Sequence, residues 1–435
     1  MKPFLLNALL CALFLALSFL YFQIALDNGF WHGDDFGYLA HNLHMTETKA
    51  ALFDNAQPYK FQPLVYGVSY FLFDRFGFEP RGYFLFNLLL HGLNAFLVYL
   101  LVQTLHRDRT VAVLSGLLFV FTVGNFGKSI MIMSGLEDLL ITTLTLFTMV
   151  FYFRTELVGG GKMRSPWYLL SLIFFIGSMF TRSTSLSILG AFLAFNYFFR
   201  KERGRRVISP NFILLLVIAA AALILKTQIF HYSPSFYTEN PGPIKYVLYA
   251  AKNVISYLVR MIFPIHTSHL VAQAGPVVRL VYGLATEIRI AIALTVVSYS
   301  FFGFIFGNHT IRFFIAWTYI MLLPFAFFQF PADWLNIRHL YLVSIGFVLV
   351  LSAGAVYCSR LIAHRGWRRL VPFVVPLFFV ILARFIALQL DHNYAIKAAS
   401  PALSSQRSEI VRRYPLVTID GDRLRFRRDM PPGSR

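Results

Sequence analysis

Two pairs of adjacent acids are the residues best placed for chemistry in this chain. Asp34 and Asp35 lie in the segment WHGDDFGY, directly before a helical-looking stretch, and Glu137 and Asp138 lie in GLEDL, at the start of an apolar run. The first pair has three explanations: carboxylates that cap a helix N-terminus, ligands of a divalent metal ion, or a catalytic carboxylate that takes a proton. The second pair has two, since the helix dipole favours acids at a helix start, whereas acids at membrane depth usually serve a site.

Basic side chains on the same predicted side of the membrane complete the pattern. Arg182 and Arg338 are each embedded between apolar helices. Any one such cation is explained as an interface anchor whose stem lies along apolar surface. Together with the acids they predict a pocket for an anionic head group, because Arg binds phosphate in a planar fork. The cations on this side include Lys60, Arg81, Lys128, Arg182, Arg260 and Arg338.

Membrane helices must position these side chains. The chain has 435 residues, of which 57% are hydrophobic and only 14% are charged, whereas soluble domains have about 45–50% and about 25%. The composition therefore excludes a soluble protein. The net charge of +19 would suit a nucleic-acid binder, but the charges form short clusters between long apolar runs. That distribution is typical of a multi-pass membrane protein and predicts no nucleic-acid partner.

The apolar runs predict an all-α polytopic membrane protein with about eleven transmembrane helices. A span needs roughly 20 apolar residues, and the first run is long enough to be a retained span rather than a signal peptide. Charges interrupt two further apolar segments, Phe61–Phe76 and Ile244–Pro264, so we predict interfacial helices there, in the first and a later outer loop. The predicted spans are Phe4–Leu26, Tyr83–Leu105, Val111–Phe126, Leu139–Phe153, Trp167–Phe180, Leu186–Phe199, Phe212–Ile229, Ile290–Phe306, Phe313–Phe330, Leu340–Tyr357 and Leu370–Leu390.

The distribution of Lys and Arg gives the predicted orientation. With the N-terminus inside, the cytoplasmic segments hold 16 cations and three acids, a net charge of +13, whereas the outer segments before the tail carry +2. Because cytoplasmic loops are enriched in Lys and Arg, both acidic pairs are predicted on the outer face. We predict a transmembrane domain over residues 1–390 and a small extracytoplasmic tail over residues 391–435. In the tail, two short alternating segments flank Asp420-Gly421, which is a β-hairpin signal.

Several other chemistries are excluded. The only cysteines, Cys11 and Cys358, both lie in apolar runs, so neither a disulfide framework nor a cysteine-based metal site is predicted. The sequence has no P-loop, dinucleotide fingerprint, His-rich metal spacing or nucleophile elbow. We therefore expect that no cofactor is required, and the single metal alternative is a divalent ion at Asp34 and Asp35.

Several segments resemble one family of membrane enzymes. The acidic pair of the first outer loop, followed by FQPL (residues 61–64) and FGFEPRGYFLFNLLLHGLNA (76–95), resembles the N-terminal module of GT-C integral membrane glycosyltransferases. The nearest is the protein O-mannosyltransferase-like branch, whose eukaryotic members carry tetratricopeptide repeats. GLEDLL (135–140) is similar to that branch's GRADLL, and IRHLY (337–341) to its ERYLY. The chain departs from the branch at Gln62, at Arg182-Ser183 and at Ile337, where the branch has Arg, Lys-Glu and Glu, and no such repeats follow.

The resemblance implies a glycosyltransferase that moves a hexose from a polyprenyl-phosphate donor to a hydroxyl of an acceptor protein or glycan. Asp34 or Asp35 would then act as the base, Asp138 with its neighbour Glu137 as a second acidic site, and Arg338 as a phosphate contact. Arg182, Lys60 and Arg260 are expected beside Arg338 at the donor phosphate. This chemistry agrees with physical expectation: fixed cations stabilise the departing lipid phosphate, and a carboxylate takes the acceptor's proton. Attack opposite the leaving group inverts the anomeric centre.

We expect a multi-pass protein of a bacterial inner membrane, with membrane lipids around it and the site on the extracytoplasmic side. Two other functions fit the same features. A carrier or flippase for a lipid-linked glycan needs the charged cavity without a base, and a non-catalytic assembly protein of the cell envelope needs neither.

Overall fold

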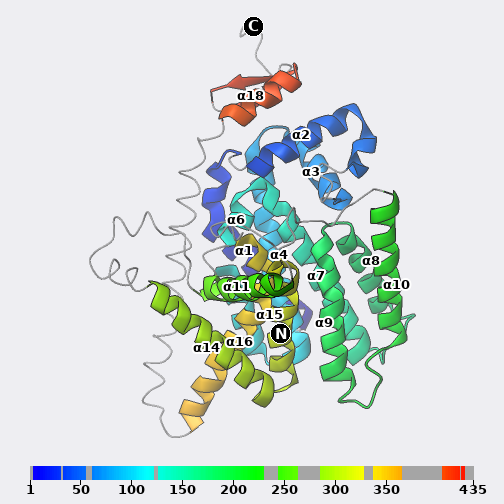
Figure 1. Ribbon diagram of the computed structural model, residues 1–435, viewed down its shortest axis with the longest axis vertical. Coiled ribbons are helices and arrows are strands. Elements are labelled where there is room, and N and C mark those ends of the chain that lie inside the picture. Colours follow the sequence, from blue (N-terminus) through cyan, green and yellow to red (C-terminus); the bar gives the residue numbers. More distant parts are fainter. Residues whose placement is uncertain are drawn as a thin grey trace.

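The computed structural model describes residues 3–30, 33–54, 61–121, 126–229, 243–262, 285–327, 337–364, 404–421 and 423–426. In these parts the chain is almost entirely helical (Figure 1). The first half contains α1 (Pro3–Phe22), η1 (Gln23–Asp27), α2 (Gly33–Glu47), η2 (Lys49–Phe53), α3 (Pro63–Phe76), α4 (Pro80–His106), α5 (Arg109–Phe121), α6 (Phe126–Met131), η3 (Met133–Gly135), α7 (Leu136–Leu157), α8 (Pro166–Met179), η4 (Ser183–Leu186), α9 (Ser187–Phe195) and η5 (Asn196–Arg200). The second half contains α10 (Pro210–Ile224), η6 (Leu225–Ile229), α11 (Pro243–Ile262), α14 (Ala285–Phe306), α15 (His309–Ala326), η7 (Ile337–His339), α16 (Leu340–His364), α18 (Ser404–Arg413), β1 (Val417–Asp420) and β2 (Arg423–Phe426).

Six of the described helical segments are long and apolar enough to cross a membrane: Phe4–Asp27, Pro80–His106, Met133–Leu157, Pro210–Ile229, His309–Ala326 and Leu340–His364. Three shorter apolar helices, α5, α8 and the Ile290–Phe306 part of α14, coincide with further predicted spans. The predicted span Leu186–Phe199 corresponds to α9, which follows the turn η4 and continues directly into the π-helical turn η5. The described residues thus form a predominantly helical polytopic membrane fold with six helices long enough for a crossing, and the predicted number of about eleven is not confirmed. The predicted span Leu370–Leu390 lies outside the described residues.

Helix α4 is the centre of the bundle and packs against α1, α5 and α7. Buried polar side chains join it to its neighbours, because a polar group in an apolar interior needs a partner. The Ser18 hydroxyl of α1 donates to the carbonyl of Leu88 at 2.7 Å. Asn94 of α4 donates to the Leu139 carbonyl of α7 at 3.1 Å and accepts from the Thr143 hydroxyl at 2.7 Å. These bonds hold the start of α7, where the second acidic pair lies.

The close packing of α15 on α16 depends on a glycine. A Cβ added at Gly346 of α16 would collide with the Thr318 hydroxyl and the Phe314 carbonyl of α15. We therefore expect Gly346→Ala to lower the free energy of unfolding by about 1–3 kcal/mol, as overpacking does. Gly354 is the matched control, because it lies on the same helix and a Cβ there meets nothing within 4 Å. Thermal unfolding of the purified protein in detergent measures both, and an equal Tm for the two variants would contradict this packing.

Three helices lie across the long ones. Figure 1 shows α2 and α3 over the upper ends of the long helices and α11 running across their direction. Helix α3 corresponds to the predicted interfacial segment Phe61–Phe76, and α11 to Ile244–Pro264. The C-terminal half of α11 is buried at Tyr257, Leu258 and Arg260.

The C-terminal unit (α18, β1 and β2) docks on α2 and α3. Its strands pair antiparallel, with Val417 opposite Phe426 and Asp420 opposite Arg423, and they coincide with the segments that alternate in the sequence. The Tyr414 hydroxyl donates to the carbonyl of Ala40 in α2 at 3.1 Å. The Phe426 ring lies 4.7 Å from the Phe78 ring, between centroids. The unit therefore lies at the same end of the molecule as the first acidic pair.

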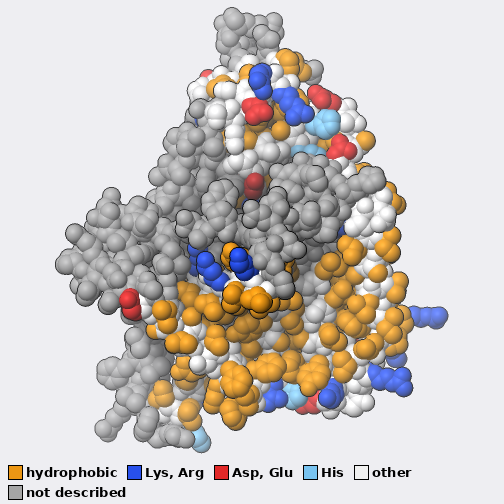
Figure 2. All heavy atoms as spheres, in the orientation of Figure 1, with side chains coloured by type: hydrophobic (Ala, Val, Ile, Leu, Met, Phe, Trp, Pro, Cys, Tyr) orange, Lys and Arg blue, Asp and Glu red, His pale blue; other side chains and the backbone are white. Residues whose placement is uncertain are grey.

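The surface shows an apolar band with cations at one margin. Hydrophobic side chains cover much of the lower part of the face in Figure 2, and Lys and Arg side chains gather at its lower edge. Large exposed apolar residues on the helices of this region include Leu193, Tyr197, Ile213 and Val217. An apolar surface of this extent suits a lipid environment. The loop after η5, with exposed Arg203, Arg205 and Arg206, supplies cations at the end far from α2.

Candidate active site

The two acids of the first pair point to different partners. Both occupy the first turn of α2, and successive residues of a helix face in different directions. The Asp35 side chain is completely buried, and its Oδ1 accepts from the backbone N–H of Ser134 in η3 at 2.9 Å. The Asp34 side chain is 36% exposed, and its Oδ2 lies 3.3 Å from Nη2 of Arg338. Asp35 thus links α2 to η3, whereas Asp34 faces a cation and remains accessible.

The second acidic pair is buried at the start of α7. The backbone of Ser129 passes against Gly135, and a Cβ at Gly135 would collide with the Ser129 carbonyl. This close approach aligns η3 with the first turn of α7, in which Glu137 and Asp138 lie with 2% and 4% of their surface exposed. Acids are favoured there by the helix dipole. Burial on this scale nevertheless requires that each carboxylate have a charged or hydrogen-bonding partner.

Arg338 provides that partner for three carboxylates. Its Nη2 lies 3.0 Å from Oε1 of Glu137, and its Nε lies 3.5 Å from Oδ2 of Asp138. With Asp34 at 3.3 Å, acids from α2 and α7 converge on one guanidinium. Burial by itself would lower the pKa of Arg338, but the facing carboxylates of Glu137, Asp138 and Asp34 outweigh it and raise this pKa. The guanidinium therefore stays charged while it is buried.

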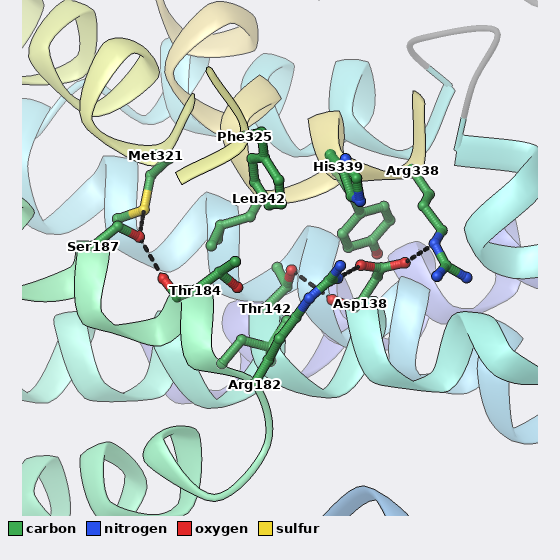
Figure 3. Close-up of a pocket in the computed structure, with 12 residues that line it drawn as sticks. Asp138, Thr142, Arg182, Thr184, Ser187, Met321, Phe325, Arg338, His339 and Leu342 are labelled. Atoms are coloured by element: carbon green, nitrogen blue, oxygen red, sulfur yellow. Dashed lines mark hydrogen bonds and ion pairs between the residues drawn. The ribbon is translucent and has the colours of Figure 1, made fainter. Parts of the chain in front are cut away.

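Arg182 reaches the same acids from the opposite side. It lies between α8 and η4 in extended backbone, and its Nη1 bonds Oδ1 of Asp138 and lies 3.7 Å from Oε1 of Glu137. Its guanidinium is also 5.8 Å from the centroid of the Phe325 ring of α15. Asp138 is consequently held between two arginines, as Figure 3 shows. In this group two arginines face three carboxylates.

Arg260 approaches from α11. It is buried, with 7% of its surface exposed. Burial raises the pKa of the Tyr257 hydroxyl on the same helix, and the positive charges of Arg260 and Arg182 work against that rise. The Tyr257 hydroxyl is 3.0 Å from Nδ1 of His339, whose ring stacks on Phe325 with 4.3 Å between the centroids. Arg260 and Arg182 thus both act on Tyr257, which links α11 to His339 at the cavity.

A small cavity lies beside Asp138 (Figure 3). Its charged end is formed by Asp138, Arg182 and Arg338. The rest of its lining combines an apolar wall with the polar side chains of Thr142, Thr184, Ser187, His339 and Tyr341. The open space is about 20 Å³, which is room for about one water molecule. A larger ligand group must therefore take the place of a side chain that now contacts the arginines. The apolar wall comprises Ile141, Met321, Phe325 and Leu342.

The structure brings together most of the predicted site residues. Asp34, Glu137, Asp138, Arg182 and Arg338 form one cluster through the contacts above, and Arg260 lies beside it. Asp35 faces away from Arg338 toward η3, Arg81 is exposed, and Lys60 lies outside the described residues. Within the described ranges, no group of three or more His, Cys, Asp or Glu side chains is placed to hold a metal ion. A divalent ion at Asp34 and Asp35 remains a prediction.

Sequence reasoning missed several polar residues that complete the site. The Tyr38 hydroxyl donates to Oε2 of Glu137 at 3.2 Å, and Nε2 of Gln62 donates to the Tyr38 hydroxyl at 2.7 Å. Tyr341, which lines the cavity, bonds Nδ1 of His91 at 2.7 Å. One signal was available, since Tyr38 follows Asp34 by four residues and therefore lies on the same face of α2. Gln62 had no such signal, because it precedes α3 and meets Tyr38 only through the packing of α3 on α2.

Comparisons with known proteins support the fold. No protein-family model and no curated protein sequence matches the chain. The solved structure of the oligosaccharyltransferase of Archaeoglobus fulgidus in the apo form is similar, with a TM-score of 0.54 and 14% sequence identity over 93% of this chain. The same enzyme tethered to an acceptor peptide containing the NVT sequon gives a TM-score of 0.52 and 14% identity over 94% of this chain. The chain spans 57% of the length of that oligosaccharyltransferase. The polytopic fold is therefore similar to that of this oligosaccharyltransferase. Membership of the GT-C superfamily and of its O-mannosyltransferase-like branch stays a prediction.

Proposed function

We propose that this protein transfers a sugar from a polyprenyl-phosphate donor to an acceptor hydroxyl on the extracytoplasmic side of a bacterial inner membrane. One observation carries the proposal: Asp34, a partly exposed carboxylate, contacts Arg338, a buried arginine at the charged end of the cavity. An exposed carboxylate suits a general base. A buried cation suits a departing phosphate, because charge that develops in a dry site is best stabilised by preorganised partners.

The reaction follows from these two groups. The acceptor oxygen attacks the anomeric carbon of the donor, and the bond from that carbon to the phosphate oxygen breaks. The electron pair of that bond stays on the phosphate, whose charge Arg338 and Arg182 stabilise, and the acceptor proton passes to Asp34. The products are the glycosylated acceptor, with its anomeric centre inverted, and polyprenyl phosphate. Asp34 returns its proton to water before the next turnover.

Donor binding and base release are coupled in this scheme. The cavity has too little room for a phosphate beside Arg338 unless a carboxylate moves. Glu137 and Asp138 are buried in the first turn of α7, whereas Asp34 is the accessible partner of Arg338. The donor phosphate therefore replaces Asp34 on the guanidinium. Asp34, released from the guanidinium, is then free to accept a hydrogen bond from the acceptor hydroxyl.

The apolar wall of the cavity suits the lipid part of the donor. Ile141, Met321 and Leu342 continue from the charged end toward α15 and α16. The first isoprenoid units, which enter from the bilayer, would make van der Waals contacts with this wall while the phosphate lies at the arginines. The acceptor, a protein or a glycan, would approach Asp34 from the aqueous side. No divalent ion is used in this scheme.

A transfer assay tests the function directly. Purified protein in nanodiscs is incubated with a panel of polyprenyl-phosphate hexoses and with peptide or glycan acceptors, and sugar transfer is followed by mass spectrometry. We expect transfer from at least one donor, with release of polyprenyl phosphate. Movement of the lipid-linked sugar across a proteoliposome membrane without any transfer would favour a carrier and contradict the proposal.

A further inference from the structure

A buried hydrogen-bond chain connects α3 to the candidate donor site. Nε2 of Gln62, just before α3, donates to the Tyr38 hydroxyl at 2.7 Å. That hydroxyl donates to Oε2 of Glu137 at 3.2 Å, and the other carboxylate oxygen, Oε1, lies 3.0 Å from Nη2 of Arg338. Gln62, Tyr38 and Glu137 expose 3%, 6% and 2% of their surface. A polar chain this deeply buried is maintained only if its bonds are made.

The direction of each bond in this chain is determined by chemistry. A carboxylate can only accept, so Tyr38 must donate its single proton to Glu137. Its oxygen is then left to accept, and the amide nitrogen of Gln62 is the group that donates to it. Burial raises the pKa of the Tyr38 hydroxyl well above its ordinary value, and the negative charge of Glu137 adds to the rise. Tyr38 therefore keeps the proton that it must donate.

We propose that Gln62 and Tyr38 are positioning residues for the donor phosphate, because they fix the Glu137 carboxylate that in turn orients the guanidinium of Arg338. This inference rests on the proposed function. Neither residue touches the cavity, so both act through Glu137. Glu137 uses one oxygen for Tyr38 and the other for Arg338 and, at 3.7 Å, Arg182. A carboxylate held at both oxygens cannot rotate, and the planar fork of Arg338 then presents a fixed face to the phosphate.

Gln62→Glu tests the direction of these hydrogen bonds, because the new side chain has almost the same shape as glutamine. In its ionised form the new carboxylate accepts a hydrogen bond from the Tyr38 hydroxyl, which then has no proton left for Glu137. Tyr38→Phe removes the same bond by another route. Gln62→Met removes the amide donor but leaves the bond from Tyr38 to Glu137 intact. We therefore expect Gln62→Glu and Tyr38→Phe to weaken the binding of undecaprenyl phosphate by about 10-fold or more, and Gln62→Met to weaken it less.

A second readout distinguishes positioning from packing. The groups that face Tyr38 are Glu137 on α7, Tyr66 on α3, Arg338 on η7 and Asp34 on α2. Burial and the charge of Glu137 would raise the pKa of the carboxyl introduced by Gln62→Glu. As the pH falls through that pKa, the protonated carboxyl can donate to Tyr38 as the amide does. The affinity of Gln62→Glu relative to the unmodified protein should recover at acid pH, and that of Tyr38→Phe should not.

Tyr168→Phe is the matched control for loss of a buried tyrosine hydroxyl. Tyr168 is also buried, and its hydroxyl donates to the Asn211 carbonyl at 2.6 Å, at the other end of the bundle. The Tyr168→Phe variant should have a lower Tm but bind undecaprenyl phosphate as tightly as the unmodified protein. Unchanged affinity in both Tyr38→Phe and Gln62→Glu, with Arg338→Lys still impaired, would overturn the positioning role alone. Unchanged affinity in Arg338→Lys as well would overturn the donor site of the proposed function, and the positioning role with it.

Discussion

Replacing Asp34 by asparagine is expected to slow sugar transfer by about 100-fold or more, the contribution of a positioned general base. The amide has nearly the same size as the carboxylate but cannot take the acceptor's proton. Asp34 is partly exposed, and its contact with Nη2 of Arg338, at 3.3 Å, is longer than that of Glu137 with the same atom, at 3.0 Å. The fold should therefore tolerate the change. The measurement is the initial rate of transfer at saturating donor, together with the Tm of the purified variant.

Asp35→Asn is the matched control for this prediction. Its side-chain oxygen can still accept from the N–H of Ser134, although a neutral acceptor bonds more weakly than a charged one. We expect most of the transfer rate to remain and the Tm to fall. If Asp34→Asn transfers sugar at nearly the normal rate, Asp34 is not the catalytic base. If Asp35→Asn alone loses the rate, the base has been assigned to the wrong member of the pair.

Replacing Arg338 is expected to have the second large effect. Arg338→Ala leaves Glu137 and Asp138 buried with one arginine fewer, and the loss of one partner of a buried pair costs about 3–5 kcal/mol. Arg338→Lys keeps the charge but loses the planar fork that reaches three carboxylates and a phosphate. We expect the Lys variant to fold and to bind undecaprenyl phosphate about 10- to 100-fold more weakly, which corresponds to ~1.5–3 kcal/mol for a charge-assisted bond.

Arg360→Lys provides the comparison for Arg338→Lys. Arg360 pairs with Asp108 at 2.5 Å on an exposed surface, toward the end of α16 opposite to Arg338. Exposed pairs contribute little to stability, so this change should alter neither the Tm nor lipid binding. If Arg338 were only an interface anchor, Arg338→Lys would likewise leave the Tm and lipid binding unchanged, because a Lys stem serves as an anchor equally well. Equal affinities in the two variants therefore exclude the phosphate role.

The site residues that could be predicted from the sequence are those whose charged side chains lie beside long apolar runs. Asp34, Glu137, Asp138, Arg182 and Arg338 stand out because charged groups are rare beside apolar runs. Their convergence followed from placing both acidic pairs on one side of the membrane, and the contacts among them agree with it. The catalytic roles themselves remain proposals.

The finer geometry could not be predicted. Adjacent residues such as Asp34 and Asp35 look equivalent in a sequence, and only the packing of α2 on η3 directs one of them to Ser134 and the other to Arg338. The chain from Gln62 through Tyr38 depends on how α2 and α3 approach α7, and no local spacing encodes that approach. The number of crossings was also uncertain for a physical reason. Apolar helices shorter than a bilayer, such as α8, have the same composition as true spans.

The docking of the C-terminal unit on α2 and α3 has a consequence for the order in which the protein can mature. Helices α2 and α3 are synthesised early, but the unit that covers them follows α16 in the chain. Until it arrives, the aromatic surface of Phe73 and Phe78 that receives Phe426 faces water. This aromatic surface is therefore completed only after α16 has been synthesised. Chaperones and proteases could reach this surface during that interval, and docking of the C-terminal unit would remove it from their reach.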